Sequence, residues 1–379
     1  MPPPRLHKKS SKASPPVLSH DFVIENHADI LSVVCIIIVC GLLFKVTNPF
    51  CSSFVSLQYN ITHYNNETGR AISTAFTYGL RDLLTVFFFT LMVIIFRAVE
   101  QEYVIDKFIK KTRLSKVKQH KYVESCNLFV FYIVSVAYGV DILTKERWVL
   151  NDSIHGLYKD YPHTEMSFAV KMFYLLQFAF WLHNFCELYL LKAKKEEITP
   201  RVIFYSLNLI FTEAAYILNF SRLGLVCILG HYVVQIVFHA SRLLVYFGKV
   251  KQGSSGLTVW SYLYPFIRFD TVALCGWIFL FALPGEESAL TSTGQGNFNQ
   301  PIVRYAAIGC ISALQIYMLM KFYAVISKYT RDQKEAEAAS SRSKQIRKKS
   351  KKNKDSKKDA DSGNEKDEEP VATGHKKKD

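Results

Sequence analysis

The sequence predicts an all-α membrane protein, a polytopic bundle of about eight transmembrane helices that ends in a disordered tail. Hydrophobic residues make up 49% of the 379 residues and aromatic residues 14%, which is too apolar for an ordinary soluble protein. The apolar residues gather in runs close to the ~20 residues needed to cross about 30 Å of hydrocarbon. We expect the spans near residues 29–48, 77–97, 126–144, 167–190, 202–219, 223–247, 259–283 and 304–326.

The segment before the first span is polar, so residues 1–28 are predicted to be a cytosolic N-terminal segment rather than a cleaved signal peptide. Lysine and arginine set the orientation, because cytosolic loops retain positive charge. Residues 97–125 hold eight basic residues, whereas residues 284–303 hold none. Residues 145–166 hold three, which weighs against this orientation, but the sum places both termini in the cytosol.

Glycosylation sequons test this orientation independently, because glycans are added only on the lumenal side. Asn60 and Asn66 both begin sequons in the first predicted lumenal loop, and we expect a glycan on one of them. Asn151 begins another in the second predicted lumenal loop, whereas Asn219 lies too near the membrane to be modified. Sequons this short also arise by chance.

The C-terminal tail, residues 330–379, is rich in Lys, Ser, Asp and Glu and is predicted to be disordered because it cannot bury a core. Much of the net charge of +15 lies in this tail and in the cytosolic loops. We expect the tail to contact anionic lipid or the RNA of the ribosome. Lys376 and Lys377 match a dilysine retrieval signal for the endoplasmic reticulum, although in so basic a tail the match can be accidental.

Two of the expected spans carry polar residues at helical spacing. Ionisable groups at membrane depth cost roughly 2.5–3.5 kcal/mol each, so they should face protein or a water-filled cavity. The pattern indicates either a binding site or a device for packing the helices. The polar residues are Asn208, Thr212, Glu213, Tyr216 and Asn219 in the first of these spans, and His231, Gln235, His239 and Arg242 in the second.

His183 and Glu187 are four residues apart and therefore share one face of the fourth span. Such a pair can satisfy each other, line a polar cavity that contacts a ligand or a passing peptide, or act in catalysis or metal binding. Mutual satisfaction is favoured, because buried polar groups need partners. No metal-ligand spacing or phosphate-binding loop is present in the sequence, so no metal and no cofactor are expected.

Two further charged pairs, Arg81 with Asp82 and Arg268 with Asp270, lie in or beside the second and seventh spans. Residues one or two apart do not face each other on a helix. Each charge must therefore find its partner on another helix, which predicts an interlocked bundle with a polar interior.

The chain resembles the translocating chain-associating membrane protein (TRAM) family of the endoplasmic reticulum in the stretches YILNFSRLGLVCILGHYVVQIVFHASRL, WLHNFCELYLLKAKKEEITPR, SPPVLSHDFVIENHADI and LQYNIT. The likeness runs from about Ser14 to Tyr329 and leaves out the tail. It implies a TLC-type fold, the multi-helix fold shared with ceramide synthases. The expected parts are a TRAM-type region of two spans at residues 29–115 and a TLC domain of six spans at residues 116–329.

The ceramide synthase pattern is only partly present, which argues against an enzyme. Asn219, Arg222, Gly224 and His231 can be placed on it. Phe204 and Tyr205 then stand where a histidine pair belongs, and Tyr232 and Gln235 replace two aspartates. Because acyl transfer to an amine needs groups that handle protons, this substitution excludes acyltransferase activity.

The resemblance instead implies a non-enzymatic helper beside the Sec translocon that contacts signal sequences and transmembrane segments of nascent chains. A marginally apolar segment is not well solvated by either water or lipid. A groove lined with polar residues would offer it surroundings of intermediate polarity. A protein that binds or senses membrane lipids is the alternative. The candidate contact residues are His183, Glu187, Glu213, Asn219, His231, Gln235, His239 and Arg242.

Overall fold

The computed structural model describes residues 16, 19–65, 67, 69–112, 114–190, 195–285, 296–327 and 331. The chain divides into two units, Met1–Gln315 and Ile316–Asp379. Of the second unit the structure describes residues 316–327 and 331, all helical. The predicted tail and its candidate retrieval residues Lys376 and Lys377 lie outside the described residues.

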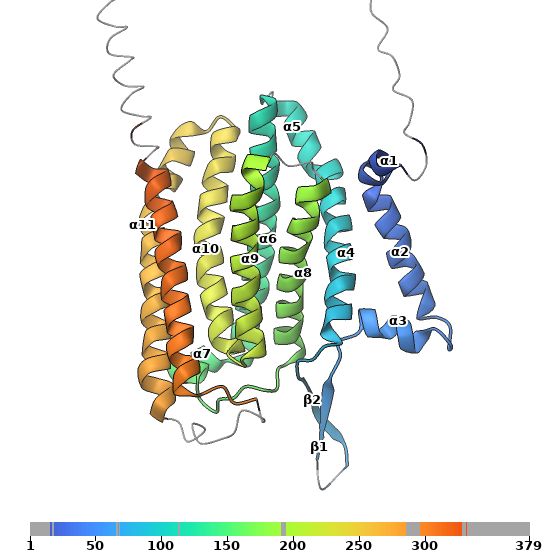
Figure 1. Ribbon diagram of the computed structural model, residues 1–379, viewed down its shortest axis with the longest axis vertical. Helices are drawn as coiled ribbons and strands as arrows, with labels where there is room; N and C mark the ends of the chain where they lie inside the picture. Colours follow the sequence, from blue (N-terminus) through green and yellow to red (C-terminus); the bar gives the residue numbers. More distant parts are fainter. Residues whose placement is uncertain are drawn as a thin grey trace, which may run out of the picture. The chain divides into compact units, whose positions relative to one another are not determined.

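Helices make up most of the described chain (Figure 1). In order, the helices are α1 (His20–Glu25), α2 (His27–Gly41), α3 (Asn48–Val55), α4 (Asp82–Glu100), α5 (Asp106–Thr112), α6 (Lys116–Glu146), α7 (Trp148–Asp152), α8 (Phe168–Leu190), α9 (Lys195–Ile217), α10 (Ser221–Tyr246), α11 (Val250–Trp277) and a last helix, Pro301–Ser327. Single π-helical turns continue α4 through Gln101–Ile105 and α11 through Ile278–Ala282.

Within the described residues, five helices are both long enough and apolar enough to cross a membrane, so the protein is a multi-pass membrane protein. They are Asp82–Lys110, Lys118–Glu146, Ser221–Tyr246, Val250–Gly285 and Pro301–Ser327. Helices α8 and α9 have 23 residues each, which is sufficient length, but both carry several charged or polar residues. The full set of eight spans stays a prediction.

The first expected span, 29–48, is corrected by the structure, because α2 ends at Gly41. The side chains of the following turn capture the last carbonyl groups of the helix. Thr47 Oγ1 donates to the carbonyl of Gly41 at 2.6 Å, and Asn48 Nδ2 donates to that of Leu42 at 2.7 Å. Local side chains of this kind compete with helix continuation, and α3 then starts afresh.

A β-hairpin lies in the first predicted lumenal loop, so the fold is mostly helical rather than all-α. Strand β1 (Asn60–Tyr64) pairs antiparallel with β2 (Ala71–Phe76), and Thr62 lies opposite Thr74. β-Branched residues in both strands favour this pairing. Asn60, the first sequon residue, is exposed, whereas Asn66 lies outside the described residues.

The core of the bundle joins α6, α8 and α10 through a chain of buried hydrogen bonds. Trp181 Nε1 donates to the Tyr232 hydroxyl at 3.2 Å, and that hydroxyl donates to Gln177 Oε1 at 2.8 Å. Gln177 Nε2 then donates to Ser135 Oγ at 3.2 Å. Because every link has a partner, these polar groups add directional contacts to an otherwise apolar core.

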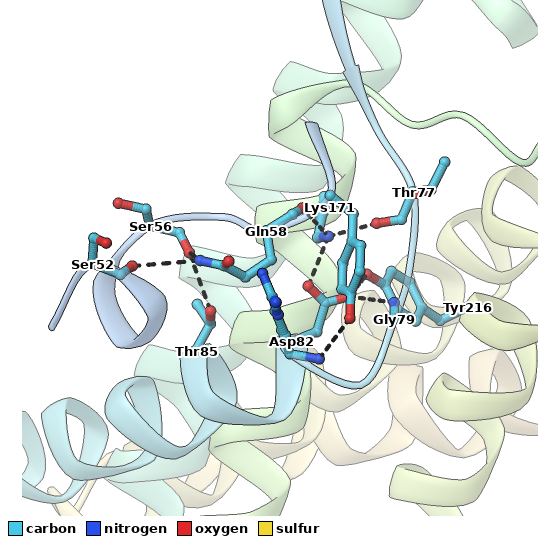
Figure 2. Close-up of polar contacts among 11 residues, drawn as sticks. Ser52, Ser56, Gln58, Thr77, Gly79, Asp82, Thr85, Lys171 and Tyr216 are labelled. Atoms are coloured by element: carbon cyan, nitrogen blue, oxygen red, sulfur yellow. Dashed lines mark hydrogen bonds and ion pairs between the residues drawn. The ribbon is translucent and has the colours of Figure 1, made fainter. Parts of the chain in front are cut away.

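A buried ion pair fixes the hairpin to the bundle (Figure 2). The Lys171 side chain of α8 is fully buried, and its Nζ lies 2.7 Å from Asp82 Oδ1 at the start of α4. The same ammonium donates to the carbonyls of Gln58 and Thr77, at 2.8 and 2.6 Å, on either side of the hairpin. Tyr216 of α9 donates to Asp82 Oδ2 at 3.0 Å. The prediction that Asp82 finds its partner on another helix is confirmed.

Candidate functional site

The first candidate site is a cavity of about 490 Å³ between α9, α10, α11 and residues 302–314 of the last helix, which we call the apolar cavity. Its volume falls within the roughly 300–1,000 Å³ of small-molecule pockets. It opens sideways where Ile210 and Ile302 are 60% and 74% exposed. The lining includes Ile210, Ala214, Leu218, Gly224, Cys227, Cys275, Ile302, Ala306, Ala307 and Leu314.

A close approach of α9 and α10 shapes this cavity, and small residues permit it. A Cβ atom on Gly224 would lie 2.7 Å from the Tyr174 hydroxyl and closer still to the Ala215 Cβ, so only glycine fits without a shift. Alanines at 214, 306 and 307 leave the space that larger side chains would fill. None of the eight predicted contact residues is among the described residues that line it.

A second cavity, of about 280 Å³, lies among α4, α6 and α8, and we call it the amphiphilic cavity. All three helices contribute apolar residues to its lining, among them Val93, Val130, Phe131, Val134 and Leu176. The polar residues that also line it are Arg97, Glu100, Asn127, Ser135, Gln177 and His183. This second space therefore combines hydrocarbon contact with hydrogen-bonding groups.

His183 and Glu187 are joined through a third residue, Arg97, that the sequence pattern did not indicate. Arg97 of α4 forms an ion pair with Glu187, and its Nη1 donates to His183 Nε2 at 3.2 Å. The other ring nitrogen of His183 contacts the carbonyl of Phe180. We expected the two side chains to satisfy each other, but the partner of each is Arg97. An imidazole and a carboxylate on one helix can share a guanidinium from the next helix.

The predicted polar stripe of α10 packs against neighbouring helices rather than lining either cavity. His231 is buried and contacts Arg268 of α11 through Nδ1, and Arg268 donates to Gln315 at 3.1 Å. His239 is buried, whereas Gln235 and Arg242 are half-buried. The expectation that Arg268 finds its partner on another helix is confirmed.

The predicted residues of α9 and its C-terminal turn separate in the structure. Asn219 is buried and donates through Nδ2 to the carbonyl of Gly296 at 2.7 Å. Glu213 is exposed, although Thr212 beside it is buried. Successive residues on a helix are turned by about 100°, so Glu213 cannot share the buried face of Thr212 and Tyr216. The structure does not bring the eight residues into one groove, and their role as contact residues stays a prediction.

Three polar residues that join helices or line a cavity were not predicted from the sequence: Arg97, Asn127 and Lys171. Each is a polar or ionisable residue inside or at the end of a long apolar run, which is a recognised signal of function or interlocking in membrane helices. Among the residues that the structure describes, no group of three or more His, Cys, Asp or Glu side chains is arranged to hold a metal ion.

Comparison with known proteins identifies the class and then the family. The TLC domain family matches residues 121–324, which places the bundle among multi-pass TLC-domain proteins. The chain is 36% identical over 307 residues to translocating chain-associated membrane protein 2 of Homo sapiens and 35% identical over 308 residues to that of Mus musculus, with 81% of each chain covered. It therefore belongs to the translocating chain-associated family of TLC-domain membrane proteins.

A more distant relative carries the name of an enzyme class. The sphingosine N-acyltransferase-like protein FUM17 of Gibberella moniliformis is 24% identical over 206 residues, which cover 53% of this chain and 52% of that protein. This similarity agrees with the partial ceramide synthase pattern in the sequence.

Proposed function

We propose that this protein is a non-enzymatic component of the endoplasmic reticulum membrane that assists nascent secretory and membrane proteins at the Sec translocon. Its task is to contact signal sequences and transmembrane segments during translocation or membrane insertion. The apolar cavity carries the proposal, because it is open sideways in a chain whose relatives are named for association with translocating chains.

The occupant that fits the apolar cavity is the apolar segment of a translocating chain. Lipid tails are as apolar as leucine, so a segment within the bilayer gains little hydrophobic free energy by entering the cavity. Packing against the cavity wall supplies a weak attraction instead. Weak contact suits a helper that must hold an apolar segment briefly and then release it into lipid.

The proposed topology places eight spans in the membrane and both termini in the cytosol. The apolar cavity then lies in the lumenal half of the bilayer, because its walls are the end of α9 and the beginning of α10. The basic tail is available to the ribosome or to anionic lipid on the cytosolic side. The glycan at Asn60 or Asn66, the retrieval signal and the domain boundaries remain part of this proposal.

Tyr232 supports a role without catalysis. It stands where the ceramide synthase pattern has an acidic residue, and its hydroxyl is engaged with Trp181 and Gln177 in the core. A tyrosine held in this way stabilises the bundle and does not replace a carboxylate as an acid or base.

Photo-crosslinking of stalled secretory nascent chains tests the proposal in membranes that contain the protein. Ala307→Phe and Ala214→Phe would fill the apolar cavity, and we expect each to reduce adducts several-fold. Ala313→Phe is the matched control, because Ala313 lies on the same helix as Ala307, is exposed and does not line the cavity. Equal adducts from all variants, at equal protein levels, would contradict the proposal.

Lipid handling is the alternative function, and the same assay separates the two. Adducts that depend on the strength of the signal sequence support contact with nascent chains. Lipid that remains bound to the purified protein and that no signal peptide displaces from the apolar cavity supports lipid handling there.

A further inference from the structure

We propose that the amphiphilic cavity between α4, α6 and α8 binds a neutral single-chain lipid whose head group carries hydroxyl groups, as a monoacylglycerol does. The site goes beyond the proposed role in translocation and does not depend on it. It differs from the apolar cavity in position, in lining and in occupant.

Asn127 is the observation that points to a ligand. This residue of α6 is 5% exposed and lines the amphiphilic cavity. Its Oδ1 and Nδ2 are both buried without a hydrogen-bond partner among the residues that the structure describes. An unpaired buried amide is costly, and it offers two donors and an acceptor. A hydroxyl group both donates and accepts, so a head group with hydroxyls can satisfy both ends of this amide.

The charges around the cavity favour a neutral head group over an anionic one. Arg97 lines the cavity, but its guanidinium is already in an ion pair with Glu187 and a hydrogen bond with His183. Glu100 lines the same space and adds a further acidic side chain. An anionic head would therefore meet a neutralised arginine and a nearby carboxylate, and its charge would not be compensated.

The apolar lining and the opening favour a single hydrocarbon chain that enters from the bilayer. Phe96 of α4 and Val134 of α6 both line the cavity and are each 61% exposed, so they mark an opening between these helices. The lining of α6 runs from Asn127 to Tyr138, roughly 16 Å along the helix axis. Asn127 stands at one end of this lining, an arrangement that matches a head group followed by a chain.

Photolabelling tests the site on the full-length protein in membranes. The probe is a monoacylglycerol with a photoreactive group in its chain and an alkyne for detection. Val130→Trp would occupy the cavity, and we expect labelling to fall about tenfold, whereas Asn127→Leu removes the head-group contact and should lower it about fivefold. Labelled peptides are expected to come from α4, α6 or α8.

Two matched control variants show whether a loss of labelling is specific to the amphiphilic cavity. Val233→Trp adds the same bulk at an exposed position of α10, and Asn208→Leu removes an amide that donates within its own helix. Both should label like the wild type. Unchanged labelling in Val130→Trp would overturn the site, and this variant decides the matter if Asn127→Leu does not fold.

Competition with a free fatty acid of the same chain length tests the preference for a neutral head group. We expect unlabelled monoacylglycerol to suppress labelling at concentrations at which the fatty acid does not. Equal competition by the two would overturn the assignment of a neutral lipid.

Discussion

The apolar cavity and the amphiphilic cavity are both sideways openings between helices, yet they differ in lining, and we propose different occupants for them. The first has small and aliphatic residues on every wall and suits a segment that must be released. The second has apolar lining, a neutralised arginine and an amide without a partner among the described residues, and it suits an amphiphile that is retained. One TLC bundle can therefore offer two kinds of contact, and the difference lies in a few polar side chains.

The two regions share one structural support. The buried ion pair joins α8 and α4, which wall the amphiphilic cavity, and Tyr216 extends it to α9, which walls the apolar cavity. Damage to this network should affect both cavities, whereas changes within either cavity should remain local.

The largest effect is expected from Lys171→Ala, because it leaves the Asp82 carboxylate buried without its cation. Breaking a buried pair in this way costs about 3–5 kcal/mol. Thermal unfolding in detergent should show the loss, together with reduced ligand contact at both cavities. Lys159→Ala is the control, since its pair with Asp152 at 3.5 Å is exposed and contributes about 0–1 kcal/mol.

Replacing both charges provides a sharper check on the same network. Lys171→Met combined with Asp82→Leu should recover much of the stability lost in the single variant, because an apolar pair leaves no buried charge without a partner. A double variant as unstable as Lys171→Ala would show that the contacts with the hairpin carbonyls matter more than the ion pair.

Acid should destabilise the region around His163, which lies beside the C-terminal end of α9 on the apolar-cavity side. Burial, followed by the nearby guanidinium of Arg222, lowers the pKa of His163 from 6.5 to about 4. The unfolded chain therefore takes up a proton before the folded one does, and stability falls as the pH drops from about 6.5 to 4, by up to about 3 kcal/mol.

Hydrogen exchange as a function of pH measures this effect by region. After correction for the intrinsic pH dependence of amide exchange, residues near Asn219 and Arg222 should be less protected at pH 5 than at pH 7. In His163→Gln this loss of protection should largely disappear. An equal loss of protection in wild type and variant would assign the acid effect to other groups.

A moderate effect is expected where α9 and α10 approach each other. Gly224→Ala introduces a Cβ against the Tyr174 hydroxyl, and overpacking of this kind costs about 1–3 kcal/mol. Gly230→Ala is the matched control on the same helix, because its nearest neighbour, Ile267 Cγ2, would lie 3.8 Å away. We expect reduced nascent-chain adducts only for Gly224→Ala. Equal behaviour of the two variants would argue against a cavity shaped by this contact.

The smallest effect is expected for Glu213→Ala. The residue is exposed and lines neither cavity, so stability should change by no more than about 0.5 kcal/mol. Crosslinking to nascent chains should also be unchanged. A loss of adducts in this variant would instead support contact through the polar residues predicted from the sequence.

The helical periodicity of the sequence predicted the helices better than it predicted where a helix ends or what lies between helices. The span at 223–247 corresponds to α10, and the pairing of Asp82 and Arg268 with other helices follows from spacing alone. The end of α2 at Gly41 depends on two local side-chain hydrogen bonds within an apolar run, and the hairpin depends on pairing between separated strands. Hydropathy detects neither feature.

The candidate site was harder to predict, because a cavity depends on which faces of several helices meet. The sequence indicates that α9 and α10 carry polar residues, but not that Glu213 faces outward or that Arg97 unites His183 with Glu187. Alanines and glycines that create the apolar cavity give no signal until their neighbours are known. The sequence does not distinguish Asn127 from other polar residues. The structure does, because its buried amide has no hydrogen-bond partner among the described residues.

The most direct test of the central claim places a photoreactive amino acid in the protein itself. At Ile302 the probe would stand at the mouth of the apolar cavity, and at Val233 it would stand on an exposed face of α10 away from it. We predict adducts with the apolar segment of a stalled signal sequence from Ile302 and few from Val233. Equal adducts from both positions, or adducts from Val233 alone, would contradict the assignment of the apolar cavity as the contact site.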